Sequence, residues 1–391
     1  MSTPPTPPEL ELGTTPTAHF GAGSIARLPD LISAAGGQSA FVVTDGALAR
    51  TNVIAEVTDL LSGAGLPVTV FAGVHPNPTT ADLAAGATAV AGLLAVRPVV
   101  VAVGGGSPID AAKGIALAAV NPQRGRALDY RSSFAAPALP LLAVPTTAGT
   151  GAETNAFGVV TDEGSRRKFY VGHATTMPAA AVLDPELTLG LPPGATAATG
   201  MDALTHAIES YLSVRANPWS AGIALQVVRT VGEFLPRAYA DGGDREARGQ
   251  LLLAAHMAGI AMATTGLGAC HAIGHALGGR FDVPHGVALS VVLPSVLRFS
   301  LPACTDRLAD LSFALGAAVT AATAEENAVA AVTAVASLAE SVGMNPKLAA
   351  FGISTDDFPQ IATDALDDEV IANAPVRPTA VEIANMLAAV A

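Results

Sequence analysis

The sequence predicts an α/β half with a parallel sheet, followed by an all-helical half. Two observations support this fold class. Up to about residue 184, short apolar runs alternate with helical patterns, which is typical of a parallel sheet with helices on both faces. Beyond that point, strand patterns stop and long helical segments rich in Ala and Leu continue to the end of the sequence. We therefore expect two domains, residues 1–187 and 188–391.

The elements of the first half are short and follow one another closely. We expect strands near 18–20, 39–45, 67–71, 98–103 and 139–144, and helices over 28–35 and about 80–96. The run 98–103 is apolar at every position, as expected for a strand that is covered on both faces. Ligands of such sheets bind at the carboxyl ends of the strands. A binding site is therefore expected in the residues that follow the strands.

The composition indicates a globular protein with a large buried core. Of the 391 residues, 50% are hydrophobic and only 14% are charged. The net charge of −13 is spread along the chain, which argues against nucleic acid or an anionic membrane as a partner. The two cysteines, Cys270 and Cys304, make no disulfide framework. Since Met1–Leu10 shows no secretory signal pattern, we expect a cytoplasmic protein.

The segment 251–279 contains no Asp, Glu, Lys or Arg and is long enough to cross a bilayer. It also contains His256, His271 and His275, together with several glycines. We therefore expect a buried helix followed by a loop of the functional site, and no membrane span.

A glycine-rich loop, Gly104-Gly105-Gly106-Ser107, follows the apolar run 98–103 and precedes a helical pattern. Its backbone permits a pyrophosphate to approach the free N–H groups at the helix N-terminus. The loop lacks the G-x-G-x-x-G pattern, and a tight turn without a ligand is the alternative interpretation. A phosphate site is favoured by polar side chains nearby, namely Asp110, Thr146, Thr147 and Thr150.

The acid at the end of another strand bears on the choice of cofactor. Asp45 closes the run 39–45, where its carboxylate can hydrogen-bond an adenosine ribose. Its charge would repel a 2′-phosphate. The sequence therefore favours NAD over NADP as the cofactor.

A set of histidines and one acid in the second half predicts a metal site. Asp202 and His206 are four residues apart, as are His271 and His275, so each pair shares one face of a helix. His285 follows a proline shortly afterwards. A single histidine is more often a core or surface residue, but imidazole and carboxylate together suit zinc and ferrous iron. We expect Asp202, His206, His271 and His285 to hold one divalent metal, with His275 left beside it for the chemistry.

In these motifs and their order, the chain resembles the iron-containing, group III alcohol dehydrogenases. The resemblance covers nearly the whole chain and is carried by Gly104–Asp110, Pro145–Glu153, Gly200–Glu209 and His271–Gly286. It implies a Rossmann-like N-terminal domain and a helical C-terminal domain, an architecture shared with dehydroquinate synthases, and a homodimer. It also implies that the metal ligands are Asp202, His206, His271 and His285, and that His275 lies near the substrate and the nicotinamide.

The same resemblance implies a set of contacts with NAD. They are Asp45, Asn77, Gly105, Gly106, Ser107, Asp110, Thr146, Thr147, Thr150, Lys168 and Leu187. For Lys168 a solvated basic run is the alternative, because Arg166 and Arg167 precede it. The expected cofactors are thus NAD and one Fe²⁺ or Zn²⁺, two ions that accept the same ligands.

The function expected from this site is that of a metal-dependent, NAD(H)-linked alcohol dehydrogenase or aldehyde or ketone reductase. A hydride would pass between the nicotinamide C4 and the carbon of a small alcohol or carbonyl substrate, with the metal as Lewis acid. His275 would relay the proton, and the alternative is that it only orients its neighbours.

Three other functions remain open from the sequence. Maleylacetate reductases look similar, but they tend to have Asn at the first ligand position, where this chain has Asp202, and a different loop from Ala148-Gly149-Thr150. Dehydroquinate synthase-like lyases share the fold, but they need a set of basic phosphate-binding residues that is sparse here. A protein that binds nucleotide and metal without catalysis is the third alternative. The exact substrate cannot be read from the sequence.

Overall fold

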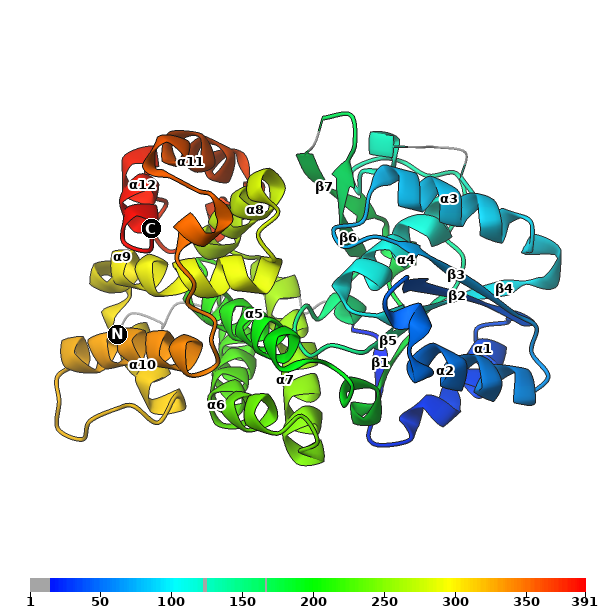
Figure 1. The fold of residues 1–391 in the computed structure, drawn as a ribbon, viewed down its shortest axis with the longest axis horizontal. Coiled ribbons are helices and arrows are strands. Elements are labelled where there is room, and N and C mark those ends of the chain that lie inside the picture. Colours follow the sequence, from blue (N-terminus) through cyan, green and yellow to red (C-terminus); the bar gives the residue numbers. More distant parts are fainter. Residues whose placement is uncertain (1–14, 122–124, 166) are drawn as a thin grey trace, which may run out of the picture.

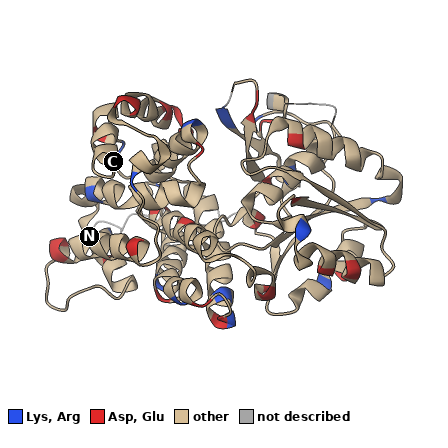
Figure 2. Cartoon of the chain, in the orientation of Figure 1, with Lys and Arg blue, Asp and Glu red and all other residues tan. Residues whose placement is uncertain are grey.

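The computed structural model describes residues 15–121, 125–165 and 167–391. Figure 1 shows two halves side by side, with the sheet and its helices on the right and a bundle of helices on the left. The segment Met1–Leu10, examined above for a signal pattern, lies outside the described residues. Acidic and basic side chains are scattered over both halves, as the charge distribution along the sequence indicates (Figure 2).

The N-terminal half is built on a six-stranded sheet in which every pairing is parallel, so the predicted fold class is confirmed. The strands lie in the order β1-β8-β5-β4-β2-β3. Their bounds are β1 (Thr17–Phe20), β2 (Ser39–Asp45), β3 (Val68–Val74), β4 (Pro98–Gly104), β5 (Leu141–Pro145) and β8 (Ala180–Leu183). β2, β4 and β5 occupy the centre of the sheet, which places their carboxyl ends next to one another.

Alternate residues of β4 face two separate cores. Val100 and Ala102 pack with residues of α3 (Thr80–Ala91) and α4 (Gly106–Ala118) on one side of the sheet. Val99, Val101 and Val103 pack with residues of α1 (Leu28–Ala34) and α2 (Asn52–Gly63) on the other side. The apolar run therefore belongs to a strand covered on both faces, as predicted. The helix expected over 80–96 is shorter, because α3 ends at Ala91 and a separate 3-10 turn, Leu94–Val96, follows Gly92.

A two-stranded antiparallel hairpin of β6 (Phe157–Asp162) and β7 (Arg167–Gly172) lies outside the main sheet, and the sequence reasoning missed it. Gly158 brings the hairpin against α4, since a Cβ at Gly158 would meet the backbone of Asp110 at 2.8 Å. The hairpin forms one wall of the space between the two halves (Figure 1).

The C-terminal half is helical around one continuous core. Its helices are α5 (Pro193–Leu212), α6 (Pro218–Ala240), α7 (Arg245–Thr265), α8 (Ala269–Phe281), α9 (His285–Ala314), α10 (Ala324–Ser341), α11 (Phe358–Asp367) and α12 (Ala380–Ala388). The division at residue 187 stays a prediction, with β8 ending at Leu183 and α5 beginning at Pro193.

The uncharged segment 251–279 forms two helices, not the expected helix and loop. Gly266 has φ +69°, which ends α7, and after a short turn the chain enters α8 at an angle of 105° to α7. In the described residues, α9 is the single helix that is by itself long and apolar enough to cross a membrane, and 61% of its most apolar window is buried inside the protein. Such burial is what the core helix of a helical domain shows.

The two halves meet where α7 crosses the 3-10 turn Ala152–Thr154. Gly151 has φ +58°, and a Cβ there would lie 2.6 Å from the Cα of Gly259 on α7. Beside this contact, His256 Nδ1 lies 3.0 Å from Glu153 Oε1, and both side chains are buried. The glycines thus let two backbones touch, and the buried pair joins the halves.

Replacing Gly259 by Ala should loosen this junction. A Cβ at Gly259 would lie 2.5 Å from Thr154 Oγ1 and 2.7 Å from the Gly151 carbonyl oxygen, so the backbones must separate. We expect a destabilisation of about 1–3 kcal/mol, measured as a lower thermal-unfolding midpoint. Gly222→Ala on α6 is the matched control, because nothing lies within 4 Å of its added Cβ. An equal midpoint for both variants would contradict the close contact.

Candidate active site

The first two candidate ligands lie on α5. Asp202 and His206 are 2% and 4% exposed, because this part of the helix packs among other helices of the C-terminal half. One helical turn separates them, and His206 Nε2 lies 3.5 Å from Asp202 Oδ1. The i, i+4 spacing therefore places the imidazole beside the carboxylate, as the sequence predicts.

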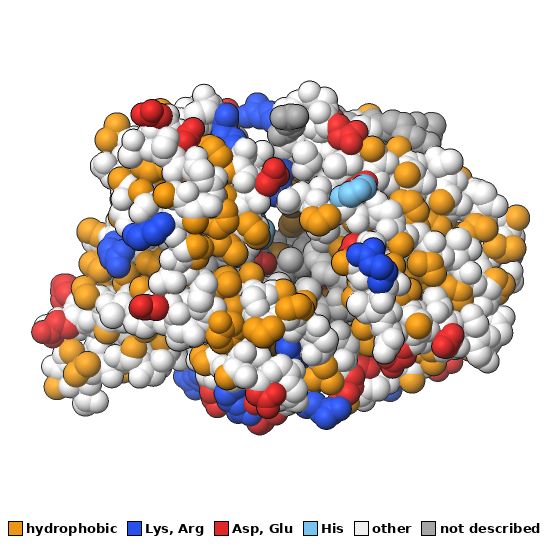
Figure 3. Space-filling model, viewed as in Figure 1, with side chains coloured by type: hydrophobic (Ala, Val, Ile, Leu, Met, Phe, Trp, Pro, Cys, Tyr) orange, Lys and Arg blue, Asp and Glu red, His pale blue; other side chains and the backbone are white. Residues whose placement is uncertain are grey.

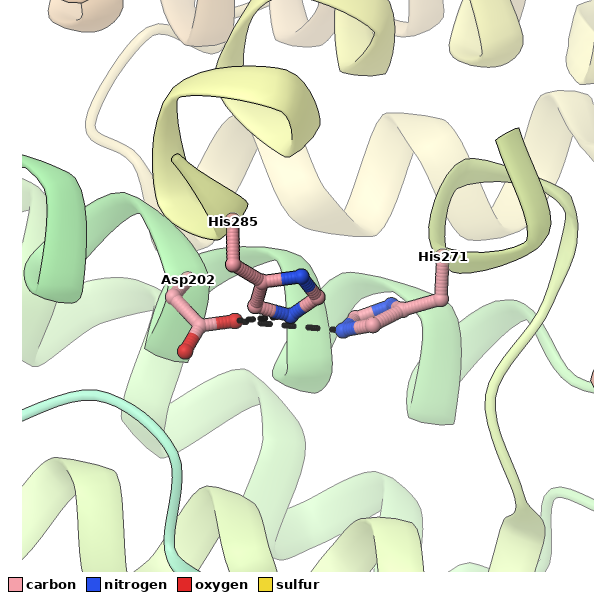
Figure 4. Close-up of side chains that lie close together, drawn as sticks. All are labelled: Asp202, His271 and His285. Atoms are coloured by element: carbon pink, nitrogen blue, oxygen red, sulfur yellow. Dashed lines mark ion pairs between the residues drawn. The ribbon is translucent and has the colours of Figure 1, made fainter. Parts of the chain in front are cut away.

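The other two candidate ligands come from α8 and α9. His271 Nε2 lies 3.8 Å and His285 Nε2 lies 3.6 Å from the same oxygen, Asp202 Oδ1 (Figure 4). His285 is the first residue of α9, and Gly286 allows this helix end to reach α5, since a Cβ there would overlap the Ala198 carbonyl oxygen. Three helices thus converge on one carboxylate oxygen.

The arrangement fits a divalent metal. Asp202 Oδ1 and His271 Nε2 are buried and have no hydrogen-bond partner among the described residues. Donor atoms of Asp202, His271 and His285 all lie within 4.8 Å of one another. In a tetrahedral site with metal–ligand distances of about 2.1 Å, neighbouring ligand atoms are about 3.4 Å apart. The separations of 3.5 to 3.8 Å from Asp202 Oδ1 to the three imidazoles are close to this value.

The charges of the cluster also suit a cation. Burial lowers the pKa of His206 to about 4 and holds the pKa of His285 well below its usual value, so both imidazoles are neutral near pH 7. Burial also acts to lower the pKa of His271, but the carboxylates of Glu209 and Asp202 overcome it and raise this pKa to about 9. A metal would take the place of that proton on Nε2.

Glu209 fixes the ring of His271, a role that the sequence reasoning missed. Its carboxylate accepts hydrogen bonds from Gly268 N (2.9 Å) and Cys270 N (2.7 Å), and its Oε2 lies 2.6 Å from His271 Nδ1. With Nδ1 bonded to an acid, Nε2 is directed to Asp202. The spacing of Glu209 from Asp202, i to i+7 on one helix, is the signal that could have identified it.

His275 lies beside the ligand cluster, one turn after His271 on α8. Its ring stacks on that of His285, with centroids 5.5 Å apart and planes 18° from parallel. Its Nδ1 lies 2.7 Å from Asp368 Oδ2, and in the described residues its Nε2 has no hydrogen-bond partner. The ring is therefore held on one side and open on the other.

A cavity of about 520 Å³ opens between the two halves and reaches the cluster. Figure 3 shows the surface hollowed at this place. Its lining includes Asp202, His206, His271, His275 and His285 from the helical half, and Asn77, Gly106, Ser107, Asp110, Thr150 and Lys168 from the sheet half. Candidate metal ligands and candidate cofactor contacts thus line one cavity.

Lys168 belongs to this cavity wall and not to a solvated basic run. It projects from β7, and its Nζ donates to Asn77 Oδ1 at 3.1 Å. Asp110 is similarly engaged, because its Oδ2 accepts from Val159 N of β6 at 3.0 Å. The hairpin therefore ties these two polar residues to the cavity.

The remaining predicted cofactor contacts lie outside the cavity lining. Gly105 packs against Thr147, since a Cβ at Gly105 would lie 3.2 Å from Thr147 Cγ2. Thr146 is 5% and Leu187 4% exposed. The residues not in the lining are Asp45, Gly105, Thr146, Thr147 and Leu187.

Asp45 ends β2, and its Oδ1 accepts hydrogen bonds from Ala47 N and Leu48 N, both at 2.8 Å. These bonds fix the carboxylate at the carboxyl edge of the sheet, beside the end of β4. Most of the residues that the structure adds to the cavity wall are apolar or aromatic, among them Tyr130, Phe157, Tyr170, Met262, Leu267 and Val370. The polar ones are Asn155, Arg215, Glu369 and Asn373.

Comparison with known proteins assigns both halves of the chain to one family. Residues 15–185 match the model of the iron-containing alcohol dehydrogenases, and residues 196–391 match the C-terminal model of the same family. A lactaldehyde reductase of Escherichia coli is 36% identical over 372 residues, which cover 95% of this chain and 96% of that protein.

Two further relatives agree. An NAD-dependent methanol dehydrogenase of Bacillus methanolicus is 35% identical over 374 residues, covering 95% of this chain and 97% of that protein. The crystal structure of a 1,3-propanediol oxidoreductase superposes with a TM-score of 0.90 at 34% identity, covering 96% of this chain and 98% of that one. By sequence and by structure, the chain belongs to the iron-containing alcohol dehydrogenase family.

Proposed function

We propose that this protein interconverts a small alcohol and its aldehyde or ketone with NAD(H), using a divalent metal held by Asp202, His206, His271 and His285. The observation that carries the proposal is the shared cavity, which is lined by the ligand cluster and by the glycine loop at the start of α4. Membership of the family makes the chain an alcohol oxidoreductase of the dehydrogenase or reductase type. The relatives named for lactaldehyde, methanol and 1,3-propanediol favour small substrates.

The metal site has the ligands for its task. A divalent ion bound there supplies a Lewis acid for the substrate oxygen. Asp202 contributes one negative charge and the three histidines are neutral ligands once the proton on His271 is displaced, so the loaded site keeps a net charge of about +1. Glu209 directs His271 toward the other ligands through its bond to Nδ1.

The sheet half supports the proposed cofactor site. The free N–H groups at the start of α4 suit the pyrophosphate, and Asp45 at the end of β2 suits the adenosine ribose. Lys168 and Asn77 are joined by a hydrogen bond at the cavity wall, and they are proposed to contact the ribose or nicotinamide. A nicotinamide held by these residues would share the cavity with the ligand cluster.

His275 is proposed to exchange the hydroxyl proton of the alcohol through Nε2, the ring nitrogen without a partner. With NAD bound, the substrate carbon would give its hydride to the nicotinamide as this proton leaves the oxygen. Apolar and aromatic side chains such as Phe157, Leu267 and Val370 exclude water from this region.

We also propose that the enzyme is cytoplasmic and forms a homo-oligomer, most simply a dimer. The two free cysteines, Cys270 and Cys304, support the first, because free thiols are usual in a reducing compartment. β1 supports the second, because it is an edge strand with Phe20 46% exposed, and an open strand edge is suited to pairing with another chain. Gel filtration with light scattering tests the oligomeric state.

His285→Ala should lose metal and activity together. Losing a residue that only orients a metal ligand costs roughly 10–100-fold in metal affinity. Because this variant removes one of the four ligands themselves, its metal affinity should fall by more than that. The fold should survive, since His285 stands at the start of α9 and faces the cavity. Metal analysis, circular dichroism and NADH-linked absorbance with short alcohols and aldehydes check this. Full activity in a metal-free variant would rule out the proposed site.

Glu209→Gln should weaken metal binding by about 10–100-fold while keeping all four ligands. The amide cannot accept from His271 and both backbone N–H groups as the carboxylate does, so the orientation of the imidazole is lost. Titration of the metal-free protein with Zn²⁺ measures the affinity. Glu233→Gln on α6 serves as the control, because Glu233 is exposed. Equal Zn²⁺ affinity in both variants would show that Glu209 does not position the ligand.

Asp45 should set the preference for NADH. The wild-type enzyme should use NADH better than NADPH, because the carboxylate repels a 2′-phosphate. Asp45→Asn keeps an oxygen for the bonds from Ala47 and Leu48 but removes the charge. The kcat/KM with NADPH, divided by the kcat/KM with NADH, should rise by about tenfold. A tenfold change lies between the effects of two unit charges about 4 Å apart in water and near a protein surface. An unchanged ratio would place the ribose elsewhere.

A further inference from the structure

Asp368 and His275 form a hydrogen-bonded pair at the edge of the cavity. His275 Nδ1 lies 2.7 Å from Asp368 Oδ2, although the two residues are 93 positions apart in the sequence. Their side chains are 13% and 16% exposed, so water competes little for the bond. Since an ionised carboxylate only accepts hydrogen bonds, the imidazole carries its proton on Nδ1.

Asp368 is itself held in place. It is the N-cap of the 3-10 helix Glu369–Asn373, and its Oδ1 accepts from Val370 N at 3.1 Å. Asn373 at the end of that helix donates to the Leu267 carbonyl oxygen at 3.1 Å, just before α8 begins. One carboxylate oxygen thus accepts a hydrogen bond from the backbone and the other bonds His275. These two bonds fix the orientation of the Asp368 side chain.

The neighbouring histidine on α8 is held in the same way, by Glu209 on its Nδ1. The two rings differ in what their Nε2 atoms face. That of His271 faces Asp202 Oδ1 at 3.8 Å, whereas that of His275 has no partner in the described residues and belongs to the cavity lining. The acid on Nδ1 therefore leaves His275 with a basic nitrogen open to the substrate space.

We propose that Asp368 is a positioning residue for catalysis, which fixes His275 with its proton on Nδ1 and its Nε2 lone pair toward the substrate hydroxyl. The proposal rests on the proposed function. In alcohol oxidation, the O–H bond breaks and its proton passes to Nε2, while the hydride leaves the carbon for NAD⁺. The carboxylate of Asp368 stabilises the imidazolium that results, and the proton then leaves to water. The products are the carbonyl compound, NADH and one proton.

Burial acts to raise the pKa of Asp368, but the interactions with His275 and the hydrogen bond from Val370 N together outweigh it, so the carboxyl pKa lies below its usual value. The acid is therefore ionised near neutral pH, as an acceptor for Nδ1–H must be. The charge of Asp368 also acts on Lys168 and Tyr170 of β7, and it raises the pKa of both side chains against its value without this acid.

Asp368→Asn tests whether Asp368 positions His275 or only fills space, because Asn has nearly the same shape as Asp but no charge. Its amide oxygen replaces Oδ1 as the cap of Val370 N, which turns the NH₂ group toward His275 Nδ1. That forces the proton onto Nε2 and removes the lone pair that the substrate needs. We expect kcat to fall by about 100-fold or more, while KM for NAD stays within about threefold. Metal content and the thermal-unfolding midpoint should match the wild type.

Asp368→Ser is the second variant, because a serine hydroxyl can still cap the 3-10 helix but is too short to reach His275. The same loss of kcat is expected. Asp367→Asn is the matched control one residue earlier, where the side chain is 59% exposed and pairs with Arg167 at 3.2 Å. It should leave kcat within about twofold of wild type, as expected for a surface ion pair.

A double-mutant cycle decides whether Asp368 acts through His275. In a His275→Ala background, Asp368→Asn should change kcat by less than about twofold, because the ring that it positions is gone. An equal loss in both backgrounds would overturn the proposal, as would a loss of metal in Asp368→Asn or a wild-type kcat in that variant. A wild-type enzyme that moves no hydride between any alcohol and NAD would instead contradict the proposed function.

Discussion

A buried carboxylate oxygen without a hydrogen-bond partner is the constraint on which the rest of this structure depends. Asp202 Oδ1 is buried and lies 3.5 to 3.8 Å from three imidazole nitrogens. A buried polar group in such a state costs free energy unless something pairs with it. A divalent cation satisfies the oxygen and the nitrogens at once. Helices α5, α8 and α9 must therefore converge, and Gly286 lets the last of them come close enough.

The sheet and the helices contribute opposite kinds of binding site to one cavity. Parallel strands end at a common edge, where backbone N–H groups at the start of α4 attract anions, whereas the buried acid and imidazoles of the helices attract a cation. A redox reaction between a dinucleotide and a polarised oxygen needs both sites within reach of each other. The contact of Gly151 with Gly259 holds the halves in that relation, and Gly151 directly follows Thr150 of the cavity wall.

What could be predicted from the sequence depended on signals that are local. The apolar run of β4 indicated a strand buried on both faces, and the i, i+4 spacing placed Asp202 beside His206. The hairpin β6–β7 was missed because Arg167 and Lys168 of its second strand follow another basic residue and are typical of a solvated loop. The site loop expected to follow the buried helix within 251–279 proved to be a short turn and a second helix, since Gly266 ends α7 and the chain then enters α8.

The two carboxylates that hold the histidines of α8 show why the rest of the site lay beyond such signals. Glu209 is on the same helix face as Asp202, so its place could be read from spacing, but its target His271 is 62 residues away. Asp368 shares no motif with His275 and meets it only because the 3-10 helix after α11 packs against the start of α8. A sequence motif identifies candidate metal ligands that lie close together on one helix, such as Asp202 and His206. The acids that bond Nδ1 of each ring come from the packing of helices. What the other nitrogen faces then separates the two rings, because Nε2 of His271 faces Asp202 whereas His275 lines the cavity.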